Sequence, residues 1–466
     1  MNVGDAVRAE VEARREAFVG LLARMVRQPS VSARGEGVRE MAALELEVLA
    51  EHGWEAQAYD TPGQPVIVAH AGPKRGQAPQ VLIYGHYDVQ PPEPLALWHS
   101  PPFEPTVRDG RMFGRGAGDN KGQHLAHILG AHVLAKVAGG LPVGVTLVLE
   151  GEEESSSPHL DAFVAQHRDR LRADVAITSD GPMAPGDVPV VALGVRGILS
   201  FELSVRGARF DNHSGNKGNV VPDPTWRLLE VLSALRGPDG RVALPGFYDR
   251  VRPVGELEER ALAALPFDPP AVAEMLGLDE AAVRAWDGVT YHRRLMLEPT
   301  FTINAIASGE IDQHKTIVPA RARVRCDMRL VADQDPEEVE AALRAFLARR
   351  FPDVEYVSHG WMRPSRTPLD HPAAAAVARA LSRAHGRPAL VQPALGGSLP
   401  DAVWTRTLGV PSLIVPYANA DERNHAPDEN MRLDLFLSGV VATAEILREL
   451  GDALAGGRGS AQQALA

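Results

Sequence analysis

Residues 81–88, with the sequence VLIYGHYD, are the first indication of an α/β fold. A run of apolar residues is followed directly by polar ones, as at the end of a buried strand. Val81–Gly85 predicts a buried strand, and His86 and Asp88 follow at its end. Helical patterns such as Gly122–Ala138 alternate with further runs of this kind, as a βαβ layout requires. These runs are Val66–Ala69, Val143–Leu149 and Val175–Thr178. The pattern predicts an α/β catalytic domain, with a central mixed, mostly parallel sheet flanked by helices.

The hydrophobic pattern changes after Gly197 and returns to its earlier form near Thr367. Between these points the strands alternate apolar and polar residues, which is typical of a sheet with one wetter face. We therefore expect an inserted α+β domain at residues 195–362. Residues 1–194 and 363–466 would form the interrupted catalytic, metal-binding domain.

The composition of the chain argues against several classes of protein. The chain has 466 residues and a formal charge of −12, from 48 basic and 60 acidic residues, which argues against a nucleic-acid partner. Its apolar runs are too short for a membrane span, and the N-terminal segment has no apolar core of a signal peptide. The single cysteine, Cys326, excludes an internal disulfide framework and fits a buried thiol on a strand. A cytoplasmic protein without a membrane partner is expected.

Several acidic and histidine side chains follow the predicted strands directly. Val143–Leu149 leads into Glu150-Gly151-Glu152-Glu153-Glu154, and Val175–Thr178 leads to Asp180. The late strand Pro411–Val415 precedes His425, and Asp119 lies just before the Gly122–Ala138 helix. Ligands bind beyond the carboxyl ends of such strands, so we expect these side chains to meet at one sheet edge.

Two imidazoles with several carboxylates and no thiolate favour zinc, with manganese or cobalt as substitutes. If one carboxylate bridges, the set is large enough for a metal pair, about 3.5–4 Å apart, that activates a water for hydrolysis. A further carboxylate would then act as general base. Taken singly, each residue is explained by a solvated loop or a turn. His124 and His127, on one helix face, are a rival metal pair or polar support near the site.

Other catalytic motifs fail. Residues 114–118 (GRGAG) lack the third glycine of a dinucleotide fingerprint and run into Asp119. Gly396-Gly397-Ser398-Leu399-Pro400 lacks the final glycine of a nucleophile elbow, which argues against a serine hydrolase. A metal-dependent phosphatase shares the two-metal logic, but no basic cluster accompanies the acidic residues.

Three longer motifs resemble a known family. They are residues 85–91 (GHYDVQP), residues 114–122 (GRGAGDNKG) and residues 150–157 (EGEEESSS). Together they are similar to the dinuclear zinc metallopeptidases that include carnosinase-type dipeptidases, glutamate carboxypeptidases, aminoacylases and succinyl-diaminopimelate desuccinylase. The resemblance extends over nearly the whole chain.

The resemblance implies two zinc sites in each subunit, with Asp119 as the bridge. His86, Asp119 and Asp180 would hold one ion, and His425, Asp119 and Glu154 the other. Glu153 would be the general base that activates a metal-bridging water. Asp88 would orient His86.

The resemblance also implies roles for the inserted domain. That domain would mediate a homodimer, and His213 of the motif at residues 211–215 (DNHSG) would reach the partner's active site to stabilise the oxyanion. Substrate contacts would come from Thr316, Arg329, Gly397 and Ser398. Without the resemblance, Arg329 reads as a solvated strand residue, Thr316 as an ordinary strand residue and Ser398 as an ordinary turn residue.

The chain departs from the family pattern at Ser156, where relatives carry glycine, and this change would alter the turn after Glu154. The run of three glutamates also leaves the register open, since a slip of one residue would give the two roles to Glu152 and Glu153.

The sequence as a whole predicts a zinc-dependent hydrolase that cleaves the amide bond of dipeptides or short peptides. The long charged segment 246–286 resembles the larger lid of carnosinase-like dipeptidases and favours this reading. The alternatives are a deacylase of N-acetyl or N-succinyl amino acids and a non-catalytic peptide-binding member.

Overall fold

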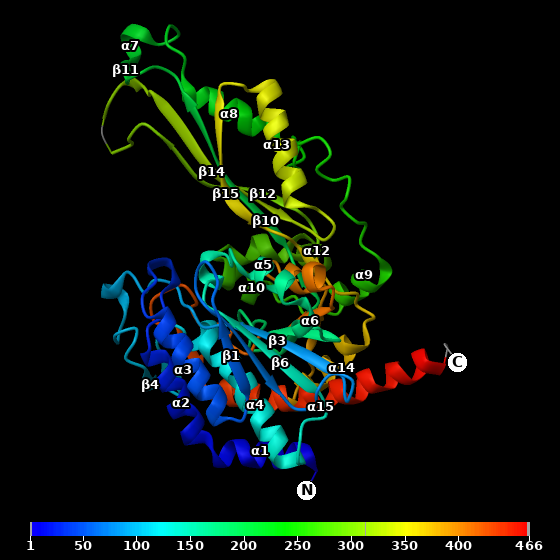
Figure 1. The fold of residues 1–466 in the computed structure, drawn as a ribbon. Coiled ribbons are helices and arrows are strands. Elements are labelled where there is room, and N and C mark those ends of the chain that lie inside the picture. The colour runs from blue at the N-terminus through cyan, green and yellow to red at the C-terminus, as the bar shows by residue number, and fades with distance from the viewer. Residues whose placement is uncertain (1, 313, 464–466) are drawn as a thin grey trace. The chain divides into compact units, whose positions relative to one another are not determined.

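The computed structural model describes residues 2–312 and 314–463 (Figure 1), and the chain divides into two compact units. Unit 1 comprises residues 1–194, 366–393 and 403–466, and unit 2 comprises residues 195–365 and 394–402. The sequence predicts a return of the chain to the first domain at residue 363. In the structure it falls at residue 366, and the short segment 394–402 belongs to the inserted unit.

Unit 1 is built on an eight-stranded mixed sheet in the order β1-β2-β6-β3-β7-β18-β8-β17. The central strands β6, β3, β7 and β18 run parallel, whereas β1 and β2 are antiparallel additions at one edge. The strands are β1 (Glu55–Tyr59), β2 (Val66–Ala71), β3 (Gln80–His86), β6 (Gly144–Glu150), β7 (Val175–Thr178), β8 (Val190–Ala192), β17 (Leu390–Gln392) and β18 (Ser412–Ile414). The predicted α/β class is confirmed.

Helices cover both faces of this sheet because its strands are apolar on both sides. Val81 and Ile83 of β3 pack into one core cluster, whereas Leu82 and Tyr84 pack into another on the opposite face. The first face is covered by α1 (Val3–Ala13), α2 (Arg15–Arg27), α3 (Val38–Glu51), α4 (Gln123–Ala138), α14 (Pro372–His385) and α15 (Leu433–Gln463). The second is covered by α5 (Leu160–Gln166), α6 (Arg168–Leu171) and a helical turn at Val403–Leu408.

Residues 3–27 form two helices instead of one, because α1 ends and α2 begins around Arg14, whose φ and ψ of −104° and 7° leave the helical range. A small sheet lies next to the polar loops of unit 1. It joins β4 (Thr106–Arg108), β5 (Arg111–Phe113) and β19 (Asn430–Arg432), with Asn430 opposite Phe113. This pairing brings the loop before β19 beside the loop that carries Asp119.

Unit 2 has an antiparallel sheet in the order β12-β14-β10-β15. Its strands are β10 (Gly197–Arg206), β12 (Thr300–Ser308), β14 (Arg321–Leu330) and β15 (Val354–Met362). Alternate residues of β10 and β14 form one core with α8 (Pro224–Leu235) and α13 (Pro336–Arg350), which lie along one side of the sheet in Figure 1. Cys326 belongs to this core, as predicted.

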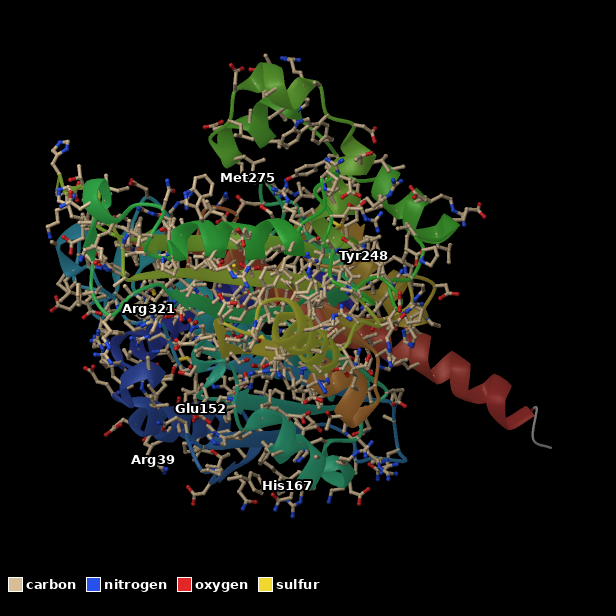
Figure 2. The ribbon with its side chains drawn as sticks, turned by 90° about the horizontal axis from the view of Figure 1, so that it is seen from above. Arg39, Glu152, His167, Tyr248, Met275 and Arg321 are labelled. Carbon is tan, nitrogen blue, oxygen red and sulfur yellow. The ribbon has the colours of Figure 1, made fainter. Side chains whose placement is uncertain are left out.

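Three short helices occupy the charged segment 246–286, whose sequence resembles a lid, and a fourth short helix follows it. They are α9 (Glu256–Ala263), α10 (Pro269–Leu276), α11 (Glu280–Arg284) and α12 (Gly288–Met296). Met275, labelled in Figure 2, is 55% exposed on α10. The remaining elements of unit 2 are β11 (Asn212–His213), α7 (Ser214–Lys217) and β13 (Ile317–Val318). The chain leaves unit 1 at β9 (Gly194–Val195) and re-enters it at β16 (Ser365–Arg366).

Candidate metal centre

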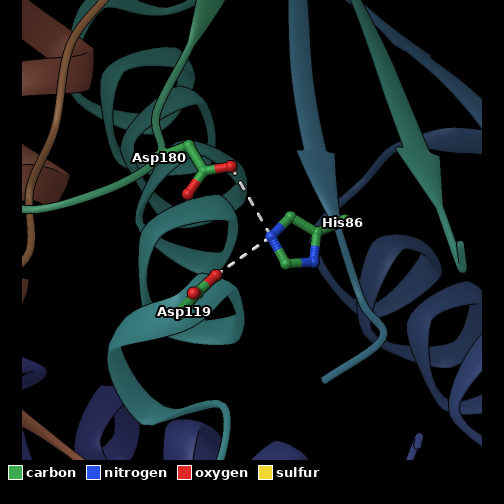
Figure 3. A group of neighbouring side chains, drawn as sticks. All are labelled: His86, Asp119 and Asp180. Atoms are coloured by element: carbon green, nitrogen blue, oxygen red, sulfur yellow. Dashed lines mark ion pairs between the residues drawn. The ribbon is translucent and has the colours of Figure 1, made fainter. Parts of the chain in front are cut away.

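His86 is the last residue of β3, and its ring lies among the carboxylates of three aspartates. Its Nδ1 lies 3.1 Å from the backbone oxygen of Asp88 and 3.4 Å from Asp88 Oδ1. Its Nε2 points between Asp119 Oδ1, at 3.1 Å, and Asp180 Oδ2, at 3.6 Å (Figure 3). The first contact does not have the geometry of a hydrogen bond and the second is too long, so this buried nitrogen has no hydrogen-bond partner among the described residues. A lone pair aimed between two carboxylates is suited to a shared cation.

Asp119 also belongs to a second group of donors through its other oxygen. Asp119 Oδ2 lies 3.1 Å from His425 Nε2, and the same nitrogen lies 3.2 Å from Glu154 Oε2. In each of the two groups, the ligand atoms lie within 4.8 Å of one another. The five residues expected from the sequence therefore meet, and Asp119 is common to both groups.

Asp88 and Gln90 hold the loop that carries the glutamates. The two oxygens of Asp88 accept hydrogen bonds from the backbone N–H groups of Glu153 and Glu154, at 3.2 and 3.1 Å. Gln90 Nε2 donates to Glu154 Oε2 over 2.8 Å, which fixes the Glu154 carboxylate. Asp88 is completely buried, so water does not compete for these bonds. Gln90 was not singled out from the sequence, although its place two residues after Asp88 was a usable signal.

The donor groups place several carboxylates close to one another, and this changes their pKa values. Burial and repulsion from Asp119 raise the pKa of Glu154 to about 7. Burial, then repulsion from Asp180, Glu154 and Asp119, raises the pKa of Glu153 well above its usual value. Hydrogen bonds to Asp119 and Glu154 raise the pKa of His425 to about 11. Carboxylates held this close are costly unless protons or cations neutralise them.

The donor set fits divalent transition metals. Each group offers one imidazole and two carboxylates, and none offers a thiolate. Such mixed nitrogen and oxygen sets suit zinc, and also manganese or cobalt. Ions placed between the donors would relieve the repulsion and occupy the direction in which His86 Nε2 points.

The rival histidine pair has other partners. His124 Nε2 lies 2.9 Å from Glu45 Oε1, and both side chains are fully buried. His127 lies 2.7 Å from Ser179 Oγ through Nε2 and 2.9 Å from Thr443 Oγ1 through Nδ1. Because Ser179 directly precedes Asp180, His127 supports the strand end that carries Asp180. Among the described residues the two histidines therefore act as polar support near the site, which was the alternative to a rival metal pair.

Unit 2 brings together three of the expected substrate-binding residues. Arg329 Nη1 donates to Ser398 Oγ over 2.7 Å, and Gly397 precedes Ser398. Arg196, which the sequence reading missed, holds this loop: its N–H donates to Gly397 O and its Nε to Gly396 O, at 3.1 and 2.8 Å. Burial lowers the pKa of Arg196 to about 10, still well above neutral pH.

His213 and Thr316 form a second group in unit 2. His213 pairs with Ile317 across β11 and β13, and the N–H of Ser214 donates to Thr316 O over 2.9 Å. The exposed ring of His213 accepts the Gly215 N–H through Nδ1 over 3.1 Å. In a neutral imidazole this assigns the proton to Nε2, which becomes a hydrogen-bond donor.

The mixed α/β sheet and the paired donor groups at its edge are those of a metallopeptidase. The chain belongs to the Peptidase family M20/M25/M40, whose model matches residues 82–449. The resemblance seen in the sequence, and the class of enzyme predicted from it, are confirmed.

Individual relatives agree with this assignment. The chain is 27% identical to the Cys-Gly metallodipeptidase of Schizosaccharomyces pombe, over 94% of this chain and 97% of the relative. It is 28% identical to the Beta-Ala-His dipeptidase of Rattus norvegicus, over 85% and 81%. The crystal structure of an M20 family metallo-carboxypeptidase from Sulfolobus solfataricus superposes with a TM-score of 0.86 at 31% identity, covering 93% of this chain and 99% of that one.

No helix among the described residues is both long and apolar enough to cross a membrane.

Proposed function

We propose that this chain is a dipeptidase that uses two zinc ions to hydrolyse the amide bond of dipeptides or short peptides. The observation that carries the proposal is the pair of three-residue donor groups that share Asp119. The names of the relatives, a Cys-Gly and a Beta-Ala-His dipeptidase, support a dipeptide substrate. They favour this reading over the deacylase alternative.

The ligand assignment follows the two groups. His86, Asp119 and Asp180 would hold one ion, and Asp119, Glu154 and His425 the other. When bound, the ions polarise the substrate carbonyl and lower the pKa of an attacking water toward neutrality. Manganese or cobalt could replace zinc on the same donors.

Glu153 is the general base in this proposal. Its carboxylate is partly buried, and the surrounding carboxylates make it a better proton acceptor than a solvated glutamate. It takes the proton of the attacking water and passes it to the leaving amine. Asp88 serves as a positioning residue, because it holds both the His86 ring and the backbone of Glu153.

Unit 2 would bind the substrate and complete the site across a homodimer. Arg329, with Gly397 and Ser398, would bind the substrate carboxylate, and Thr316 the backbone. His213 would donate its Nε2–H to the oxyanion in the partner subunit.

The surface of unit 2 supports the homodimer. α8 and the chain segment before it leave four large apolar side chains exposed: Phe210, Val220, Trp226 and Leu229. The edge strand β12 also leaves Ile303 and Ile306 about half exposed, at 48% and 51%. Apolar patches on soluble proteins mark interaction sites. A Trp226→Asp variant should therefore be a monomer by light scattering, whereas the same change at Leu97, an exposed apolar residue of unit 1, should leave the mass of the dimer unchanged.

A cytoplasmic location belongs to the proposal as well. The chain's single thiol, that of Cys326, is free and buried, and burial raises its pKa to about 12, so that little of the reactive thiolate forms in the folded chain.

Metal analysis of the purified protein, combined with turnover of a dipeptide library, tests the proposal. Two zinc equivalents per chain and dipeptide hydrolysis that a chelator abolishes and zinc restores are expected. N-acetyl and N-succinyl amino acids serve as comparison substrates. Faster turnover of those compounds would replace the dipeptidase by a deacylase. Tight peptide binding without turnover in the zinc-loaded protein would make the chain a non-catalytic binder.

A further inference from the structure

Glu429 is a completely buried carboxylate that touches the loop carrying Asp119 at several points. Its Oε1 accepts hydrogen bonds from the backbone N–H groups of Gly116, Gly118 and Asp119, at 3.0, 3.1 and 3.1 Å. Its Oε2 accepts from Arg115 Nη1 over 2.7 Å. One side chain thus satisfies three backbone donors and one guanidinium of the same loop.

The backbone of Glu429 adds a further tie. The N–H of Gly114 donates to Glu429 O over 3.0 Å, which continues the pairing between β19 and β5. Glu429 lies four residues after His425 on the segment before β19. It therefore connects the segment that carries His425 to the loop that carries Asp119.

Two glycines allow the close packing of the loop that carries Asp119. Gly116 adopts a φ of 88°, which favours glycine, and a side chain on Gly118 would collide with the buried carboxylate of Glu422. Arg115 is itself almost fully buried, so its charge offsets that of Glu429 without competition from water.

The N–H of Asp119 is one of the three donors, so Glu429 restrains the backbone of Asp119 itself. The two oxygens of Asp119 face His86 and His425, at 3.1 Å each. A rotation of this residue would spoil both contacts together. Partners that orient a ligand commonly change metal affinity by about 10–100-fold when they are removed.

We propose that Glu429 is a positioning residue of the metal centre, which fixes Asp119 between the two donor groups and thereby sets the affinity for both ions. The inference rests on the proposed role of Asp119 as a shared ligand. It assigns to Glu429 a function in metal binding in addition to its part in packing.

Metal affinity, measured by competition with a chromophoric chelator, tests the inference. In Glu429→Asp the carboxylate is drawn back from the three N–H groups, and we expect zinc affinity to fall about 10–100-fold at both sites. Glu429→Gln keeps an oxygen acceptor for those N–H groups but loses the charge opposite Arg115. The zinc affinity of Glu429→Gln should therefore lie between those of wild type and Glu429→Asp, which is the partial rescue expected of a positioning role.

Glu445→Gln is the matched control. Glu445 is also a buried carboxylate, it pairs with Arg383 and Arg448 on helices that carry none of the donors, and its loss should lower stability alone. Zinc affinity within threefold of wild type in folded Glu429→Asp would overturn the inference. If that variant does not fold, Glu429→Gln decides by the same criterion. Failure of the wild type to bind two ions would instead overturn the proposed function.

Discussion

The carboxylate of Asp88 accepts a hydrogen bond from the backbone N–H of Glu153 over 3.2 Å, and so joins the loop after β3 to the loop after β6. Asp88 has no exposed surface, so water does not compete for this bond. The loop after β6 is therefore held through its backbone. The side chain of Glu153 is left free of that task. It can therefore be exchanged without moving the neighbouring Glu154.

Replacement of Glu153 by glutamine should abolish most activity while keeping the metal. The amide has nearly the shape of the carboxylate but cannot accept the proton, so kcat should fall by about 10²–10⁴-fold. Zinc content and melting temperature should match wild type. Glu152→Gln is the matched control, since Glu152 lies 2.7 Å from His159 instead. Loss of kcat in Glu152→Gln, together with loss of zinc in Glu153→Gln, would shift the two roles by one residue.

Mixed dimers test whether His213 acts on the partner subunit. His213→Ala and Asp119→Ala should each be inactive as homodimers. After mixing at equal amounts, about half of the dimers are hybrids, and each hybrid has one intact site of two, so about a quarter of wild-type activity should return. Turnover is measured before and after subunit exchange. No recovery, despite exchange seen by mass spectrometry, would place His213 in its own subunit's site.

The buried ring of His127 should make stability depend on pH. Burial, assisted by repulsion from His124, lowers the pKa of His127 to about 3 from its ordinary 6.5. Between these values the unfolded chain binds a proton that the folded chain does not, so stability is complete above about pH 6.5 and falls as the pH falls. From pH 7 to pH 5 the loss from this group is about 2 kcal/mol.

Urea denaturation of metal-free protein at the two pH values measures this loss. His127→Gln cannot titrate, so its free energy of unfolding should fall by about 2 kcal/mol less than that of wild type over the same interval. Equal losses in both proteins would mean that the pKa of His127 is the same in the folded and the unfolded chain.

The elements that the sequence predicted well are those whose own residues carry the signal. Val175–Thr178 has the predicted bounds, and the helix expected at Gly122–Ala138 begins one residue later, at Gln123, because apolar periodicity marks both elements. The break between α1 and α2 at Arg14 has no such local signal, since the apolar spacing continues across it.

The donors were predictable for a similar reason, because each follows a strand or a glycine-rich loop in a pattern that is visible locally. Glu429 and Arg196 could not be predicted from the sequence in this way. Their partners lie more than 300 and about 200 residues away, and a buried glutamate or arginine looks like any surface residue until the fold is known. The assignment of residues 394–402 to unit 2 likewise depends on distant contacts.

The turn after Glu154 carries a strained serine, and its replacement should stabilise the protein. Ser156 adopts φ and ψ of 70° and 28°, a left-handed conformation in which a side chain is unfavourable. Ser156→Gly should raise the free energy of unfolding by about 0.5–1 kcal/mol, net of the entropy of glycine. Ser155→Gly, inside the preceding helical turn, should lower it. Zinc affinity should not change in Ser156→Gly, and a change would show that the serine shifts Glu154.

Substrates with and without a free carboxylate test the role of Arg329. Its guanidinium already donates to Ser398 Oγ over 2.7 Å, which leaves the planar fork oriented for a second acceptor. Lysine cannot reproduce that geometry, so Arg329→Lys should raise KM for dipeptides by about 10- to 100-fold, with kcat nearly unchanged. For the same dipeptides carrying a C-terminal amide, wild type and variant should have similar KM values. An equal loss for acids and amides would mean that Arg329 shapes the loop instead of binding the carboxylate.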